Sequence, residues 1–208
     1  PLSALTAADI LTTEWPEPRW VVPTMLCEGL GILAGRPKIG KSWLALQVAC
    51  AVATGGRVFD KDVEAGPVLY LALEDSPRRL QSRMRYLGWS NNNPGDADFL
   101  TLTEFLDQIG PLNAGGAEVL ARQIRARRYR LAVIDTLSRS IRGDQNDADV
   151  MTAALSPLQG VALDCGCALV FVDHHRKANM TGADPILDIG GSVSKGGVAD
   201  TVWAIYKE

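Results

Sequence analysis

The chain has 208 residues, of which 47% are hydrophobic and 22% are charged, and its formal net charge is −3. This length and apolar content allow one substantial hydrophobic core and favour a single domain over two. The slight excess of acidic residues excludes binding to nucleic acid through overall positive charge, so any such contact must come from a local basic patch.

The distribution of apolar residues and cysteines argues against a membrane-spanning or disulfide-stabilised protein. The fully apolar stretches are far shorter than the roughly 20 residues that a membrane-spanning helix needs, so we expect no membrane partner. The four cysteines lie in apolar surroundings and lack the spacing of a disulfide framework. They are typical of small core residues in a reducing compartment, which predicts a cytoplasmic protein.

The chain begins with an N-terminal arm over residues 1–23, which is rich in Pro, Thr and Trp and has no sustained hydrophobic period. Such a segment is expected to pack on the core rather than to fold as a domain. Residues 24–208 are expected to form the domain itself.

The next segment fits the phosphate-binding P-loop pattern G-x-x-x-x-G-K-[ST] at every fixed position: Gly35-Arg36-Pro37-Lys38-Ile39-Gly40-Lys41-Ser42. Glycine is needed at both ends because a side chain would keep the backbone N–H groups from wrapping the phosphates. Lys41 brings a point charge to the phosphates, Ser42 is placed to ligate Mg²⁺, and the following helix adds its dipole. The loop therefore predicts binding of a nucleoside triphosphate with Mg²⁺, with Trp43 as a neighbouring nucleotide-binding residue.

Around this loop, short apolar runs alternate with segments of helical periodicity. The runs predict strands over residues 30–34, 68–73, 99–102, 131–134, 168–172 and 201–205. The periodic segments predict helices over about 41–54, 77–87, 114–128 and 148–164. This order is typical of an α/β fold in which a mostly parallel, twisted sheet carries helices on both faces.

Two carboxylates, Glu74 and Asp75, follow the second predicted strand. ATP hydrolysis needs a group that orients or deprotonates the attacking water, and this group projects from the carboxyl edge of a strand beside the P-loop. The alternative is local, because Asp75-Ser76-Pro77 is a favourable helix start. Both hold if Asp75 or Ser76 caps the helix while Glu74 faces the γ-phosphate.

Two other predicted strands end in polar residues. Asp135 follows the run 131–134 and is placed to supply the second carboxylate that positions Mg²⁺; the alternative is a helix cap. The run 168–172 ends in a polar burst, Asp173-His174-His175-Arg176-Lys177. His174 is placed to hydrogen-bond the γ-phosphate, and the alternative is a surface pair of histidines.

These motifs occur in an order that resembles RecA-like P-loop ATPases. Within that class, the chain resembles the group of hexameric plasmid replicative helicases of the RepA type and related AAA-type mobile-element ATPases, over residues 20–208. The resemblance is carried by Gly35–Ser42, Leu73-Glu74-Asp75-Ser76, Val133-Ile134-Asp135-Thr136, Val172-Asp173-His174-His175 and Ala199-Asp200-Thr201-Val202.

The resemblance implies a role for each matching position. Glu74 corresponds to the general base, Lys41 and Ser42 to the phosphate and Mg²⁺ ligands, Asp135 to the carboxylate of the Walker B strand, and His174 to a sensor of the γ-phosphate.

The resemblance also implies a homo-oligomer, in the form of a hexameric ring, and two roles for basic residues. Arg83 matches a phosphate-contacting arginine of the group, with a solvated helix charge as the alternative. RecA-like rings place a basic residue in the neighbouring subunit's site, where it stabilises transition-state charge. Lys207, after the last strand, is the candidate and Lys195 its competitor, although lysine lacks the planar fork of arginine.

Single-stranded DNA is the expected partner of such a ring. The loops that face the central channel of these motors correspond here to segments with Arg139 and Arg142, and then Arg176 and Lys177. Basic residues of this kind contact phosphates, which makes binding salt-dependent and largely independent of sequence. No aromatic residue interleaves them, so no base-stacking platform is expected.

Three functions are compatible with these features. The first is a ring-forming helicase or DNA-translocating ATPase in replication or recombination of a plasmid, phage or mobile element. The second is a small-molecule kinase. Such enzymes usually close an arginine-bearing lid over the nucleotide, whereas the one basic residue in the segment 179–197 is Lys195. The third is a regulatory or loader ATPase that acts on a protein partner.

Overall fold

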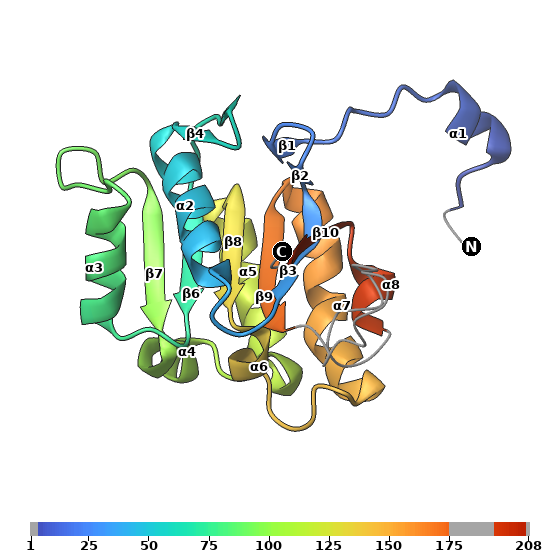
Figure 1. The fold of residues 1–208 in the computed structure, drawn as a ribbon. Helices are drawn as coiled ribbons and strands as arrows, with labels where there is room; N and C mark the ends of the chain where they lie inside the picture. The colour runs from blue at the N-terminus through green and yellow to red at the C-terminus, as the bar shows by residue number, and fades with distance from the viewer. Residues whose placement is uncertain (1–3, 175–193, 207–208) are drawn as a thin grey trace.

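A computed structural model describes residues 4–174 and 194–206 (Figure 1). Its centre is a six-stranded sheet in which every strand is parallel to its neighbours. In spatial order the strands are β10 (Thr201–Ile205), β3 (Gly29–Gly35), β9 (Ala168–His174), β8 (Leu131–Asp135), β6 (Val68–Ala72) and β7 (Ala97–Thr101). The predicted α/β fold with a parallel sheet is confirmed.

Helices cover both faces of this sheet, and each face has its own hydrophobic core. On one face lie α2 (Lys41–Thr54) and α3 (Pro77–Tyr86), and on the other α4 (Leu102–Gln108), α5 (Gly116–Arg127) and α7 (Ala148–Cys165). The strands β3, β6 and β8 are buried along their whole length, because both of their faces carry helices. The expected arrangement of helices on both faces is confirmed.

The four predicted helices all form, with ends that differ by at most two residues from the prediction. The helix α2 has the predicted bounds, since it starts where the phosphate loop ends and stops at Gly55, whose φ of 71° ends the helix. The strand predicted over 99–102 was wrong at its end. Leu102 instead begins α4, because Thr101 and Glu104 form a capping box in which the Thr101 N–H donates to Glu104 Oε2 at 3.0 Å.

Several short elements were not predicted, since each is too short for a hydrophobic period to show. They are the helices α1 (Ala7–Thr12), α4, η1 (Leu112–Ala114), α6 (Leu137–Ser140) and α8 (Ser194–Val198), the hairpin of β1 (Trp20–Val22) and β2 (Leu26–Cys27), and the hairpin of β4 (Arg57–Val58) and β5 (Lys61–Asp62). None of them changes the order of the central sheet.

The N-terminal arm differs from expectation. Residues 4–20 are exposed, α1 buries no residue, and Figure 1 shows this helix standing away from the sheet. Among the arm residues that the structure describes, only Val21 and Val22 are buried; they lie in β1 and belong to the core on the α2 face of the sheet. Among the described residues, no helix is both long and apolar enough to cross a membrane.

Candidate active site

Four of the predicted site segments meet at one edge of the sheet. In a parallel sheet the carboxyl ends of neighbouring strands lie side by side, and the register here pairs Gly35 with His174 and Ala72 with Asp135. Glu74 follows β6 by two residues and reaches the same edge. The sheet order therefore brings together residues that are up to 139 positions apart in the chain.

The phosphate loop has the backbone that an anion site requires. Lys38 and Gly40 have positive φ angles of 64° and 107°, which turn the chain sharply into α2. No side chain caps the N-terminus of α2, so its first-turn N–H groups are left for a ligand. A Cβ at Gly35 would lie 3.0 Å from Ile39 Cγ2 and 3.3 Å from Ile205 O, so only glycine fits there without a shift.

Lys41 lies across this loop with 6% of its surface exposed. Its Nζ donates to the carbonyl oxygens of Gly35 at 2.9 Å and Arg36 at 3.1 Å, and lies 3.4 Å from His174 Nδ1. Burial lowers the pKa of Lys41, while the carboxylates around it oppose that shift. The carbonyl oxygens of the phosphate loop thus hold the Lys41 ammonium over the loop, next to His174.

Asp135 is 3% exposed, and its two carboxylate oxygens have different surroundings. Oδ2 accepts a hydrogen bond from the Tyr70 hydroxyl at 2.9 Å, whereas Oδ1 is buried and has no hydrogen-bond partner among the described residues. Burial raises the pKa of Asp135, and the nearby hydroxyls of Ser42 and Tyr70 oppose the rise. A buried carboxylate oxygen left unpaired beside a serine hydroxyl suits Mg²⁺, which prefers oxygen ligands. Ser42 and Asp135 could therefore hold the metal.

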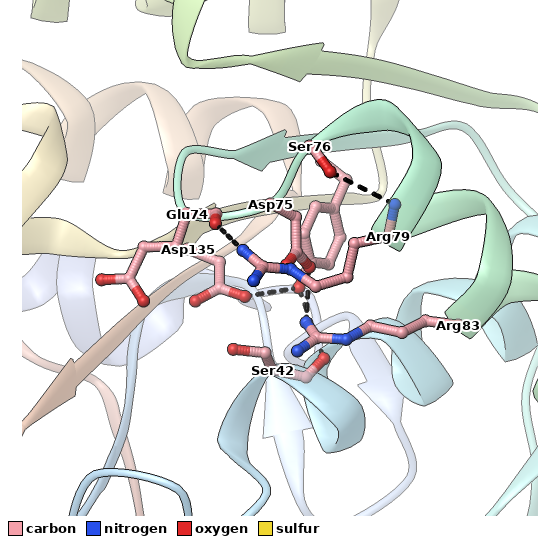
Figure 2. Close-up of polar contacts among 8 residues, drawn as sticks. Ser42, Glu74, Asp75, Ser76, Arg79, Arg83 and Asp135 are labelled. Carbon is pink, nitrogen blue, oxygen red and sulfur yellow. Dashed lines mark hydrogen bonds and ion pairs between the residues drawn. The ribbon is translucent and has the colours of Figure 1, made fainter.

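Glu74 is the exposed carboxylate of the site. Its Oε1 accepts a hydrogen bond from Thr136 Oγ1 at 3.0 Å, and Thr136 itself is buried directly after Asp135. The side chains of Glu74, Asp135 and Ser42 lie close together in Figure 2. A cavity of about 410 Å³ opens beside them, lined by Pro37, Lys38, Gly40, Lys41, Ser42, Trp43, Glu74, Arg83, Thr136 and His174.

The start of α3 separates the roles of Asp75 and Ser76. Ser76 caps the helix, accepting from the Arg79 N–H at 3.4 Å with Pro77 in the first turn. Asp75 instead accepts hydrogen bonds from the guanidinium groups of Arg79 and Arg83 (Figure 2). Since Ser76 serves as the cap and Asp75 as the ion-pair partner, the Glu74 carboxylate is left to face the cavity.

Arg83 is held on two sides at the rim of this cavity. Besides its ion pair with Asp75, the guanidinium carbon lies 5.4 Å from the centroid of the Trp43 ring. Trp43 in turn meets Tyr86 edge-on, with ring centroids 5.3 Å apart. These contacts place Arg83 and Trp43 next to the phosphate loop, where the sequence predicts nucleotide-binding residues.

The expectation that Lys195 is a competitor for a basic residue acting in a neighbouring subunit is wrong. Its side chain is fully buried and pairs with Asp173 at 2.7 Å, with Gln145 Oε1 at 3.3 Å from the same Nζ. A lysine enclosed in its own subunit cannot reach another. Lys207 lies outside the described residues, as do His175, Arg176 and Lys177.

Two residues of the site have no signal in the sequence that would single them out. Tyr70 reads as one more apolar residue of a buried strand, and Thr136 as the residue after a strand. Both act through contacts with residues more than 60 positions away, Tyr70 with Asp135 and Thr136 with Glu74. Only the pairing of β6 with β8 reveals them.

A protein-family model described as an AAA domain matches residues 1–180. The chain belongs to the AAA domain family. It is therefore a P-loop ATPase, in agreement with the loop at Gly35–Ser42, and its parallel sheet is that of a RecA-like fold.

Proposed function

We propose that this AAA-domain protein is an ATP-hydrolysing motor that assembles as a ring and moves on single-stranded DNA, as a helicase or translocase of a plasmid, phage or mobile element. The observation that carries the proposal is the set of side chains that line the 410 Å³ cavity, in which Lys41 lies beside His174 and Thr136 hydrogen-bonds Glu74. Each has a distinct task in phosphoryl transfer.

The binding step relies on the loop and the start of α2. The uncapped N–H groups of the helix and the Lys41 ammonium would hold the β- and γ-phosphates. Mg²⁺, held by Ser42 and Asp135 Oδ1, would supply charge neutralisation at the phosphate oxygens when bound. Arg83 and Trp43 would flank the nucleotide at the rim.

The chemical step needs a base and a group that responds to the γ-phosphate. Glu74 is exposed to the cavity and oriented by Thr136, which suits a carboxylate that deprotonates or orients the attacking water. His174 lies next to Lys41, so its ring would contact the γ-phosphate and change partner when that phosphate leaves. Asp173, the preceding residue, accepts from the His174 N–H at 2.8 Å and fixes the backbone there.

The DNA contact would come from the loop after β8. Arg139 and Arg142 are exposed, and the backbone of Arg142 is anchored by Asn113, which donates to its carbonyl at 2.7 Å and accepts from its N–H at 2.8 Å. An anchored backbone with a solvent-facing guanidinium suits a phosphate contact. A ring would also place a basic residue of one subunit in the site of the next. Lys207 is the candidate for this role, because its competitor Lys195 is enclosed in its own subunit.

One observation favours a second candidate, a regulatory or loader ATPase that acts on a protein partner. The N-terminal arm exposes large apolar side chains, with Leu11 at 84%, Leu5 at 63% and Trp15 at 57% exposure. Apolar groups gathered on one short exposed segment mark interaction sites in soluble proteins. The small-molecule kinase is less favoured, because no described residue outside the P-loop and α3 brings a lid arginine to the cavity.

The test is ATP hydrolysis by the purified chain with and without single-stranded DNA, together with its mass in solution in the presence of a non-hydrolysable ATP analogue. The motor predicts that DNA stimulates hydrolysis, that the stimulation falls with salt, and that the mass is that of a ring. A monomer that hydrolyses ATP and ignores DNA would contradict the motor and favour the partner-regulated ATPase.

A further inference from the structure

Tyr70 is a buried tyrosine whose hydroxyl belongs to the active site although its ring belongs to the core. The residue is 2% exposed, and its ring packs against Phe99 with centroids 5.7 Å apart. The ring alone would serve this packing equally well as phenylalanine. The hydroxyl adds a polar group that costs free energy to bury unless it is hydrogen-bonded.

That hydroxyl has one proton, and it donates it to Asp135 Oδ2 at 2.9 Å. The other oxygen within reach, the Ser42 carbonyl, is at 3.5 Å and lies at the limit of a hydrogen bond. Within the part of the chain that the structure describes, Asp135 therefore receives the one short hydrogen bond that Tyr70 donates. The strands β6 and β8 are neighbours in the sheet, so the contact is built into the framework rather than into a loop.

The hydrogen bond from Tyr70 fixes the orientation of the Asp135 carboxylate. The terminal torsion of an aspartate is soft, so without a partner the carboxylate would turn over a broad range. With Oδ2 held by Tyr70, Oδ1 is the oxygen left buried beside Ser42, without a hydrogen-bond partner among the described residues. Partners of this kind orient metal ligands in other proteins, and their loss weakens metal binding.

We propose that Tyr70 is a positioning residue that holds the Asp135 carboxylate with Oδ1 directed to the bound Mg²⁺. This inference rests on the proposed role of Ser42 and Asp135 as the metal ligands. It assigns Tyr70 no contact with the nucleotide and no part in the proton transfer. Its effect is on how tightly the metal is bound, and hence on the share of nucleotide bound as the metal complex.

The experiment compares the native protein with Tyr70→Phe, Asp135→Asn and a matched control, Tyr129→Phe. Tyr129 is equally buried and also donates its hydroxyl to an aspartate, Asp98, but it lies at the opposite edge of the sheet. Mn²⁺ serves as the metal probe, and its affinity in the presence of a non-hydrolysable ATP analogue is measured by electron paramagnetic resonance. Nucleotide affinity in EDTA is measured separately with a fluorescent ATP analogue, below the temperature at which each variant begins to unfold.

The expected result is that Tyr70→Phe weakens Mn²⁺ binding by about 10-fold or more, the usual effect of losing such a partner. Its nucleotide affinity in EDTA should stay at the native level, and Tyr129→Phe should bind both ligands as the native protein does. Native Mn²⁺ affinity in Tyr70→Phe, with Mn²⁺ binding lost in Asp135→Asn, would overturn the inference and leave the proposed metal site standing. Native Mn²⁺ affinity in Asp135→Asn would overturn both.

Discussion

The buried ion pair between Lys195 and Asp173 makes Lys195→Met a sharp test of how the site is held. The pair joins α8 to the end of β9, next to His174, and neither side chain has more than 1% of its surface exposed. Methionine keeps most of the length of the lysine side chain but removes its charge. Asp173 would then be a buried carboxylate without its counter-ion.

The structure sets the size of the effect. Removing one member of a buried pair costs about 3–5 kcal/mol, because the remaining charge is left uncompensated. Asp173 Oδ1 keeps its hydrogen bond from the His174 N–H at 2.8 Å, so we expect the lower end, about 3 kcal/mol. With an m value of about 1–3 kcal/mol/M in urea, the midpoint should fall by about 1 M or more.

Equilibrium unfolding in urea measures this, with two comparison variants. The double variant Asp173→Asn/Lys195→Met removes both charges and should regain most of the lost stability, because a buried pair replaced as a whole is often neutral. Lys61→Met, at a partly exposed lysine of β5, should change stability by about 0.5 kcal/mol or less. A loss below about 1 kcal/mol in Lys195→Met, or no recovery in the double variant, would refute the reasoning.

Two substitution tests and one labelling test probe the loop and the core. Lys41→Ala should lower ATP affinity on the order of 100-fold by removing a charged donor, and unchanged affinity in a fluorescence titration would remove this lysine from the site. Gly35→Ala should destabilise the protein by about 1–3 kcal/mol, because the new Cβ would crowd Ile39. The control, Gly160→Ala in α7, should stabilise it by about 0.5–1 kcal/mol, because a Cβ there meets no atom within 4 Å. A higher melting temperature for Gly35→Ala than for Gly160→Ala would contradict the packing. Burial raises the pKa of Cys167 to about 12, so its thiol stays protonated at pH 8 and iodoacetamide should label it only in urea. Labelling of Cys167 itself at the same rate in the native protein would contradict its burial.

The sequence predicts the layout of this protein well because its signals are local. The α2 helix has the predicted bounds, since the phosphate loop marks its start and Gly55 its end. The strand β10 also has the predicted bounds, as a run of apolar and β-branched residues. The placement of site residues at strand ends follows from the same rule for parallel sheets.

The contacts that orient the site were not predictable, because they join residues that are distant in the chain. Tyr70 with Asp135, Thr136 with Glu74 and Lys195 with Asp173 each depend on which strands or segments become neighbours. A basic residue in a glycine-rich stretch resembles an exposed one until its partner is known, so the sequence leaves Lys195 as a competitor of Lys207 for the role in a neighbouring subunit.

The central claim is that Glu74 deprotonates or orients the water that attacks ATP, and Glu74→Gln tests this role most directly. Glutamine keeps the shape of the side chain and can still accept from Thr136 Oγ1, but it cannot take a proton. ATP binding should remain at the native level while steady-state hydrolysis falls by a factor on the order of 100 or more. Native turnover in this variant would contradict the account and leave Glu74 without a part in hydrolysis.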